Sequence, residues 1–375
     1  MLIDKLPSRS RSVILWAIGS FFAAQLVLAI VIERWRPEWS DPEYGYRLHH
    51  LRQRILENPD HPLLVVLGSS RVGQGFKADV LPPPSWNNPA SPIVFNMSLS
   101  GGTPVHELLF IKRLLAAGIH PRWVVIEVLP ASLKGEADIL AAKDILPPNR
   151  LRWTDLQVLQ RHAPQHSVHR YEHWFKVHAF SSYFNRFAMV HCWAPALLDM
   201  SKPFQSSSDE MSPHGWHPFP YERVSPELYQ SMFQVARKAY APILSQFRIV
   251  PEADRIFREM LDVCRHEEIE VIGLLRMPEA TDFRALYPPE TSRLIDRYLR
   301  DLCRQYETEY IDASQWLSDD NFADGHHLLP QGAERFSLRL WDEVLEKHPL
   351  FRERPEVRLE DSDHLPTEGS VSHVD

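Results

Sequence analysis

The sequence has little cysteine and no long run of basic residues. Its three cysteines, Cys192, Cys264 and Cys303, are too few and too scattered for a metal knuckle or a disulfide framework. One disulfide between Cys264 and Cys303 stays open for an exported domain, but helix-like sequence around both favours free, buried thiols. The formal net charge of -8 gives nucleic acid no electrostatic footprint, so we expect no nucleic-acid partner.

Cofactor fingerprints are also missing. The chain contains no Gly-x-Gly-x-x-Gly sequence and no P-loop, so we predict no nucleotide cofactor. His166, His169 and His173 share one face of a helix if that segment is helical, but neither an acidic cluster nor an HExxH sequence accompanies them. We therefore predict no metal site and place these histidines at the wet margin of an aromatic-rich helix.

One long apolar run stands near the N-terminus. The stretch from Ser12 to Ile32 has no charged residue and is long enough to cross a bilayer as a helix, which takes about 20 residues. Basic residues precede it, and this bias favours a cytoplasmic tail at 1–11, a transmembrane anchor at 12–32 and all later residues outside, periplasmic or extracellular. A cleaved signal peptide is the alternative, but no small-x-small cleavage site follows the run.

Beyond the anchor, short apolar runs alternate with helical patterns. Helices are expected over 103–117, 252–266 and 292–306, the first with Thr103 as N-cap and Gly118 just past its end. This rhythm predicts an α/β fold with a doubly wound parallel sheet. The expected strands are Leu63–Leu67, Ile93–Asn96, Trp123–Val128, Val271–Leu275 and Tyr310–Ile311.

The same reading divides the chain into segments. A charged, helical neck is expected at 33–62, and a catalytic α/β domain at 63–145 and 251–351. The rhythm stops at 146–250, where His, Trp, Phe, Tyr and Pro are frequent, so we predict a mainly helical insertion that serves as a lid or a docking region. The charged stretch 352–375 has few large apolar residues and is predicted to be a disordered tail.

Two short signatures lie far apart in the sequence. Leu67-Gly68-Ser69-Ser70-Arg71 follows the first strand and presents a serine, and Asp324-Gly325-His326-His327-Leu328 supplies a carboxylate and an imidazole. Serine needs a base, and histidine acts well as a base only when a third group orients it. The alternative is that Ser70 caps a helix while Asp324 and His327 shape the turn before a helix opening at Pro330. His326 is the rival base.

This pattern resembles the SGNH (GDSL-like) hydrolase family, which implies a three-layer α/β fold. By that resemblance Ser70 is the nucleophile, His327 the base and Asp324 its orienter. The segment from Phe95 to Gly102 resembles the second block of the family, so the N–H groups of Ser70 and Gly101 are expected to form the oxyanion hole. The third block departs from the pattern, because Ala131 stands near the position where the family usually has an asparagine donor.

The first signature, the single anchor and the anomalous third block look most like membrane-tethered members of the family that move acyl groups onto extracellular polysaccharides. The resemblance implies O-acyl transfer or ester hydrolysis at the cell envelope, with an acyl donor, a polysaccharide acceptor and a membrane acyl-exporting protein as partners. A non-catalytic polysaccharide-binding or assembly protein and a membrane-tethered lipase or esterase are the alternatives. Candidate substrate-binding residues are Arg71, His214, His217 and Arg276.

Overall fold

The computed structural model describes residues 8–85, 87–141, 147–197 and 211–348. The predicted disordered tail at 352–375 lies outside the described residues, as do parts of the predicted insertion. The predicted cytoplasmic tail at 1–11 is described only from Ser8, where the first helix already begins.

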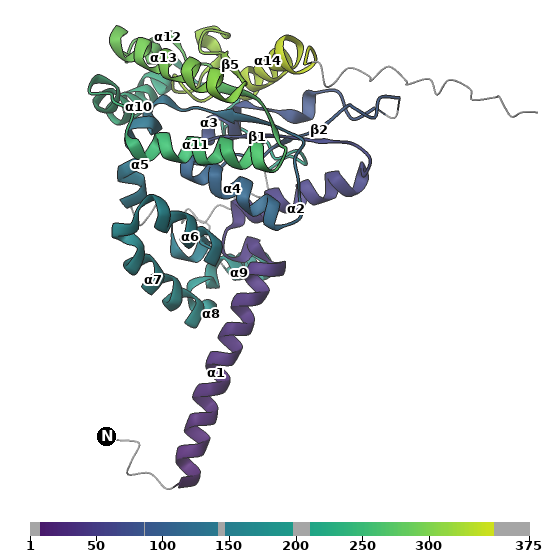
Figure 1. The fold of residues 1–375 in the computed structure, drawn as a ribbon, viewed down its shortest axis with the longest axis vertical. Coiled ribbons are helices and arrows are strands. Elements are labelled where there is room, and N and C mark those ends of the chain that lie inside the picture. Colours follow the sequence, from purple (N-terminus) through teal and green to yellow (C-terminus); the bar gives the residue numbers. More distant parts are fainter. Residues whose placement is uncertain (1–7, 86, 142–146, 198–210, 349–375) are drawn as a thin grey trace, which may run out of the picture.

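Five parallel strands form one sheet with the order β2-β1-β3-β4-β5 (Figure 1). The prediction of an α/β fold with a parallel sheet is therefore confirmed. The chain adds β2 on one side of β1 and then β3 on the other, so the winding reverses between β1 and β3 and the sheet is doubly wound. The strands are β1 Leu63–Leu67, β2 Ile93–Asn96, β3 Trp123–Glu127, β4 Glu270–Arg276 and β5 Glu309–Asp312.

Helices cover both faces of the sheet. Residues alternate across a strand, so Val65 and Leu67 of β1 point into one hydrophobic core and Leu64 and Val66 into another. The long helices are α1 Ser8–Trp35, α2 Pro42–Glu57, α4 Pro104–Ala116, α5 Pro130–Ala141, α6 Trp153–His162, α7 Ser167–Ala179, α9 Arg186–Trp193, α10 Pro226–Ser245, α11 Pro251–His266, α13 Pro289–Tyr306 and α14 Pro330–Leu340. The short ones are α3 Ser70–Gly75, α8 Ser181–Phe184 and α12 Thr281–Arg284, together with single turns η2 Pro37–Trp39, η3 Ala78–Val80, η4 Pro148–Arg150, η5 Pro164–His166, η6 Pro195–Leu197, η7 Asp319–Asn321 and the π-helical η8 Trp341–Leu345.

Different helices fill the two cores. Helices α2, α4, α10, α11 and α13 contribute to the first core, and α3, α14 and η8 contribute to the second. The result is three layers, helix, sheet and helix, with both faces of each strand shielded from water. Helices α4, α11 and α13 thus share one face of the sheet, and α3 and α14 share the other. In Figure 1, α4 and α11 lie on the side of the sheet toward α1, and α14 lies on the side away from it.

Helix α1 projects from the domain (Figure 1). Its stretch Arg9–Trp35 is long and apolar enough to cross a membrane by length and composition. The predicted neck at 33–62 is not a spacer, because α2 packs against the sheet domain through Tyr44, Leu48 and Leu51, which are fully or almost fully buried. The packed domain thus begins before Leu63.

The described part of the segment 146–250 is mainly helical and divides in two. Helices α6 to α9 lie beside the domain end of α1, with α7 and α8 in contact with α1 (Figure 1). Helix α10 instead packs into the core of the sheet domain through Phe233, Ala236 and Leu244. The insertion therefore contributes both to the junction with α1 and to the body of the domain.

Candidate active site

The structure brings the two sequence signatures together beyond the carboxyl end of β1. Ser70 Oγ lies 2.9 Å from His327 Nε2, and His327 Nδ1 lies 2.8 Å from Asp324 Oδ2. These distances allow the serine hydroxyl to donate to the imidazole and the imidazole N–H to donate to the carboxylate. Ser70 itself is only partly buried.

Local hydrogen bonds fix the carboxylate and the imidazole relative to each other. Asp324 Oδ1 accepts from the backbone N–H groups of His326 and His327, at 3.1 and 2.9 Å. The loop is closed where Ala323 N–H donates to the His327 carbonyl at 2.9 Å. Burial opposes ionisation of Asp324, but the hydrogen bonds from His326 and His327 outweigh it and hold the pKa of this carboxyl well below its usual range.

His326 has a different environment from His327. Its side chain is 6% exposed, its ring stacks on Phe283 at 4.9 Å between centroids, and Tyr240 meets it edge-on at 5.1 Å. Burial, followed by the charge of His327, lowers the pKa of His326 to about 4. The ring bonded to Ser70 is that of His327, so the geometry separates the two rival bases.

Ser69 rather than Ser70 caps α3. The Ser69 side chain accepts from Arg71 N–H at 3.2 Å, and the Ser69 backbone N–H donates to Glu127 Oε2 at 2.7 Å. Ser70 is the first residue of the helix itself. The alternative reading of Ser70 as a helix cap is wrong, because its neighbour takes that role.

The turn at Gly68 to Ser70 after β1 is called the serine turn below. Gly101 lies in a second tight turn, which packs against it. Leu99 N–H donates to the Gly68 carbonyl at 2.9 Å, and Gly102 N–H donates back to the Leu99 carbonyl at 2.7 Å. Gly101 has φ +69°, a conformation that favours glycine. In the described part of the chain, no backbone carbonyl accepts from the N–H of Ser70 or Gly101. The two groups expected at the oxyanion hole therefore come from adjoining turns.

Ala131 does not face this site. It is 4% exposed and lies in the hydrophobic core. The side chain of β3 that reaches the serine turn is Glu127, whose carboxylate accepts the Ser69 N–H. Glu127 was missed in the sequence, where its only signal is an acidic residue at the end of an otherwise apolar strand.

Arg71 lies beneath the serine turn rather than in front of it. Its side chain is 1% exposed, and its Nη2 donates to the carbonyls of Met277 and Pro278 at 3.1 and 3.0 Å. Glu279 and Glu127 lie on either side of its guanidinium, with closest ion-pair distances of 3.4 and 3.8 Å. The predicted contact between Arg71 and substrate is not supported, because its guanidinium is enclosed by two carboxylates and two carbonyls and is almost fully buried.

Arg71, Glu127, Glu279 and Arg276 together form a buried ionic layer. Arg276 Nη2 lies 2.9 Å from Glu279 Oε2, and the Tyr287 hydroxyl donates to Glu279 Oε1 at 2.8 Å. Arg276 thus forms a buried ion pair, and its predicted contact with substrate is not supported. The layer places two arginines against two glutamates, so its charges balance.

The loop that carries His214 and His217 runs along the edge strand β2. Asn96 N–H donates to the His214 carbonyl at 2.9 Å, and His214 Nδ1 lies 3.1 Å from the Val94 carbonyl. These contacts hold His214 against the edge of the sheet, and its predicted contact with substrate is not supported. His217 N–H donates to the Gly73 carbonyl of α3 at 3.0 Å, so its role toward a substrate stays a prediction.

The insertion places two aromatic rings at the site. Phe219 follows the His214 loop, and its centroid lies 6.0 Å from that of His327. Tyr240 on α10 packs on His326 and Phe283. Burial raises the pKa of the Tyr240 hydroxyl, and the lowering effect of the Arg71 charge is partly offset by the charge of Glu127. Phe219 therefore lies beside the imidazole of His327, and Tyr240 covers the buried imidazole of His326.

Metal ligation is a rival use of the second signature. Among the described residues, the one group of three potential ligands that converge is Asp324, His326 and His327, whose ligand atoms lie within 4.8 Å of one another. His166, His169 and His173, where we predicted no metal site, are not part of such a group among the described residues. His327 Nε2 lies 2.9 Å from Ser70 Oγ, so an ion bound to that nitrogen would compete with Ser70.

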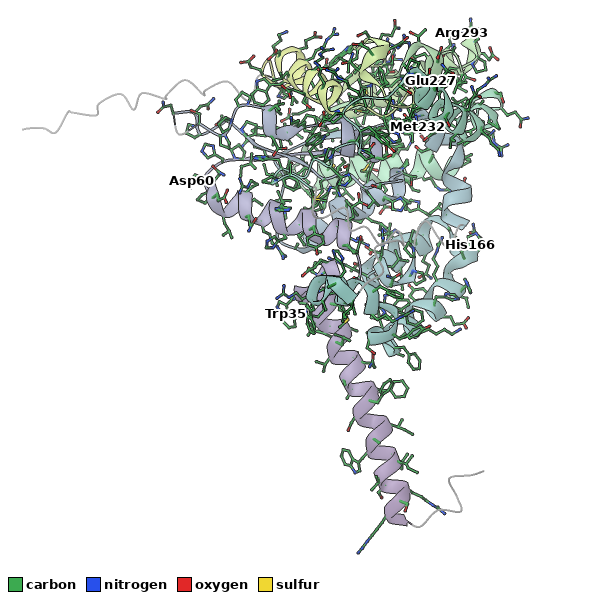
Figure 2. All side chains as sticks on the ribbon, turned by 180° about the vertical axis from the view of Figure 1, so that it is seen from behind. Trp35, Asp60, His166, Glu227, Met232 and Arg293 are labelled. Carbon is green, nitrogen blue, oxygen red and sulfur yellow. The ribbon has the colours of Figure 1, made fainter. Side chains whose placement is uncertain are left out.

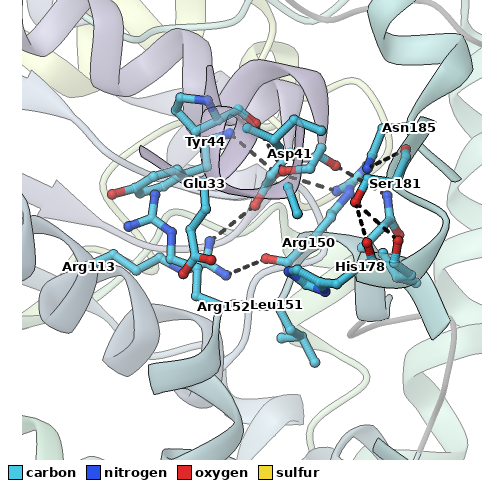
Figure 3. Close-up of a pocket in the computed structure, with 16 residues that line it drawn as sticks. Glu33, Asp41, Tyr44, Arg113, Arg150, Leu151, Arg152, His178, Ser181 and Asn185 are labelled. Carbon is cyan, nitrogen blue, oxygen red and sulfur yellow. Dashed lines mark hydrogen bonds and ion pairs between the residues drawn. The ribbon is translucent and has the colours of Figure 1, made fainter. Parts of the chain in front are cut away.

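A separate polar cavity lies at the junction of α1, α2 and the insertion (Figure 3). Its volume is about 30 Å³, room for about one water molecule, so it is not a substrate site. Arg113 crosses the junction, with ion pairs to Asp41 at 3.1 Å and to Asp155 at 2.6 Å. All three side chains are buried, so the junction is held by charge-assisted bonds.

Comparison with known families matches residues 47–332, more than half of the chain, to the family described as "Protein of unknown function (DUF1574)". The chain belongs to the DUF1574 family. The match includes both signatures and leaves out α1. Neither the curated proteins nor the solved structures gave a match.

Proposed function

We propose that this DUF1574 protein is a membrane-anchored serine acyl-enzyme of the SGNH type that acts on ester bonds at the cell envelope. The observation that carries the proposal is the chain of two short hydrogen bonds, from Ser70 Oγ to His327 Nε2 and from His327 Nδ1 to Asp324 Oδ2. Hydroxyl, imidazole and carboxylate in this order are the parts that nucleophilic catalysis by serine requires. The position of Ser70 just after the first strand of a parallel sheet supports the proposed SGNH type.

The reaction follows from the geometry. His327 Nε2 takes the Ser70 proton while Oγ attacks the acyl carbon, and the ester bond breaks as the leaving oxygen receives that proton. A hydroxyl of the acceptor then gives its proton to His327 and attacks the acyl carbon, and His327 returns that proton to Ser70 Oγ as the bond between Ser70 and the acyl group breaks. The N–H groups of Ser70 and Gly101 are proposed to stabilise the oxyanion in both steps.

Transfer to polysaccharide is proposed over simple hydrolysis. The residues described around β3 offer no asparagine donor, and one lost oxyanion donor typically costs about 10²- to 10³-fold in kcat. A slow acyl-enzyme suits an enzyme that waits for a sugar hydroxyl, and Phe219 beside His327 supports exclusion of water. A membrane acyl-exporting protein is the proposed source of the acyl group, by analogy with the family that the chain resembles.

The charge bias before Ser12 supports α1 as an uncleaved anchor with the sheet domain outside the cytoplasm. Protease added to intact cells or spheroplasts should therefore digest the domain. A domain that stays protected until the membrane is broken would contradict this topology.

The catalytic assignment is tested with the full chain on a model acetyl ester. Ser70→Ala and His327→Ala should each lower kcat by a similar factor, on the order of 10⁴ or more, and Asp324→Asn by less, because the orientation of His327 partly survives. His326→Gln is the matched control and should keep most of the activity. A dead His326→Gln with an active His327→Ala, or no activity in the parent chain, would favour the metal or the non-catalytic reading.

A further inference from the structure

The helices α7 to α9 expose an unusual number of large apolar side chains. The exposed fractions run from 41% for Phe184 to 70% for Trp193. Soluble surfaces rarely gather such residues without a partner, and a contiguous apolar patch marks a protein or a membrane contact. The residues that carry the patch are Phe175, Phe180, Tyr183, Phe184, Phe187 and Trp193.

Contacts with α1 give the depth of this patch. Ser182 N–H donates to Gln25 Oε1 at 2.9 Å, and the Phe180 ring lies 6.2 and 5.9 Å from the rings of Phe21 and Phe22. Gln25 precedes Ile32, the end of the charge-free run, by seven residues, which is about 10 Å along a helix. Phe21 lies about 16 Å from the same end. Helix α8 is therefore level with a point about one third of the way into a stretch that would span a hydrocarbon core of about 30 Å, and the Phe180 ring just before α8 reaches its middle.

The chain descends to this depth and returns. Figure 2 places His166, just before α7, farther from the free end of α1 than Trp35, and Figure 1 shows α7 running down beside α1 to α8. Helix α9 leads back, since the Trp193 ring lies 5.2 Å from Trp39, which follows α1. Helices α7, α8 and α9 form a hairpin whose tip is α8, and Trp193 stands at the level of the membrane surface, where tryptophan is enriched.

Several polar groups at the tip are bonded within the protein, and among the described residues Asn185 Oδ1 is the buried exception. The Ser182 N–H is taken by Gln25, Asn185 Nδ2 donates to the Ser181 carbonyl at 3.0 Å, and Ser181 Oγ donates to the His178 carbonyl at 2.9 Å. Hydrocarbon offers no water to satisfy such groups, so internal bonds are what a membrane-embedded tip requires. Gln25 itself, the clearly polar residue of the charge-free run, is buried at 7% exposure by this contact.

Charges flank the tip and do not enter it. No Asp, Glu, Lys or Arg lies between Lys176 and Arg186. The Arg186 guanidinium lies over the rings of Tyr183 and Phe187, at 4.1 and 4.3 Å from their centroids. Its long side chain can carry the charge toward the headgroups while its stem stays among apolar groups.

We propose that α7 to α9 form a second membrane attachment, a hairpin whose tip enters the leaflet at the C-terminal end of α1, with lipid acyl chains as its partner. This proposal rests on α1 being the membrane span of the proposed function. A single helix lets a domain rotate and tilt, whereas two attachments hold the sheet domain at one height and orientation over the bilayer. Arg113 of the sheet domain pairs with Asp41, which follows α1, and with Asp155 of α6, which precedes α7, so the segments next to both attachments are fixed to the domain.

The test uses the purified full chain in phosphatidylcholine and phosphatidylglycerol vesicles. A Cys192→Ser background removes the partly exposed thiol, while Cys264 and Cys303 are buried. An environment-sensitive fluorophore is attached in turn to Tyr183→Cys at the tip, to Val27→Cys on the exposed face of α1, and to Val168→Cys, 80% exposed at the start of α7. Nitroxides on the lipid acyl chains then report contact with hydrocarbon.

We expect the labels at 183 and 27 to be quenched to a similar extent, several-fold more than the label at 168, which aqueous iodide should quench instead. A quenched label at 27 with an unquenched label at 183 would overturn the hairpin and leave the anchor standing. That outcome would assign the patch to a protein partner or a second copy of the chain. An unquenched label at 27 would overturn the anchor, and the hairpin with it.

Discussion

Ser69 and Ser70 are neighbours with different tasks. Ser69 gives its hydroxyl to the cap of α3 and its N–H to Glu127, and this leaves the Ser70 hydroxyl to His327. The sequence indicated a serine at this turn and pointed to Ser70 by the resemblance. The division of roles between the two residues depends on Glu127, which lies 58 positions away and only meets the turn through the sheet.

The buried ionic layer predicts strongly non-additive stabilities. Arg71→Met alone leaves Glu127 without its ion-pair partner, and Glu127→Leu alone leaves two arginines against Glu279, so each change should lower the free energy of unfolding by about 3–5 kcal/mol. The double variant removes both charges, and Arg276 still pairs with Glu279, so it should cost less than the sum of the single changes by about 1–3 kcal/mol. Chemical unfolding of the full chain in detergent measures all three.

Arg304→Gln is the control for this cycle. Arg304 pairs with Asp301 on the surface, where both side chains are more than half exposed, so its loss should cost at most about 1 kcal/mol. Additive effects of Arg71→Met and Glu127→Leu would show that the two groups do not stabilise each other.

Because the pKa of His326 is lowered in the folded chain, we expect the free energy of unfolding to depend on pH. At about 4, the folded pKa of His326 lies below the ordinary value of 6.5, so the unfolded chain takes up the proton first as the pH falls. Stability is therefore lost as the pH falls from about 6.5 toward 4. Linkage gives a loss of about 2 kcal/mol between pH 7 and pH 5 from this group.

Chemical unfolding at both pH values checks this expectation. The loss of stability between pH 7 and pH 5 should be smaller in His326→Gln than in the parent chain by about that amount. The same loss in both proteins would show that the buried imidazole is not the titrating group.

At the scale of elements, the turn after β2 meets the serine turn at Gly102. A Cβ at Gly102 would come within 2.7 Å of the Leu99 carbonyl oxygen and 2.9 Å of the Gly68 carbonyl oxygen, and neither backbone can move without shifting Ser69 and Ser70. Gly102→Ala should therefore lower kcat on the model ester by about 10²-fold, as a displacement of about 1 Å can.

Gly101→Ala is the matched control. A Cβ there meets open space, and its penalty is the positive φ, which costs roughly 1–2 kcal/mol of stability for an alanine. Its N–H is retained, so kcat should change little. Equal kcat losses for the two variants would contradict the close approach of the turns.

The elements were predictable where local sequence decides them. All five strands were found from their apolar runs, and the expected helices at 103–117, 252–266 and 292–306 correspond to α4, α11 and α13. Contacts between distant segments were not readable in the same way. The burial of α2, the pairing of the His214 loop with β2 and the ionic layer at Arg71 all depend on which segments the fold brings together.

At the scale of the whole molecule, the proposed function depends on two features, α1 as the membrane anchor and the side chains of Ser70, His327 and Asp324 as the catalytic groups. The sheet domain is joined to the end of α1 by a junction that includes Asp41 and Arg113 (Figure 3). Asp41, Arg113 and Asp155 are all buried there. The apolar run of α1 was evident in the sequence. The level of α8 along α1 was not, because it depends on contacts between residues more than 150 positions apart.

The most direct test of the acyl-enzyme is intact-mass measurement of the full chain after exposure to an activated acetyl ester. The proposed mechanism predicts one added acetyl group on the parent chain, none on Ser70→Ala, and faster loss of that group when an envelope oligosaccharide is added than in buffer alone. An unmodified parent chain, or equal labelling of the Ser70→Ala chain, would contradict it.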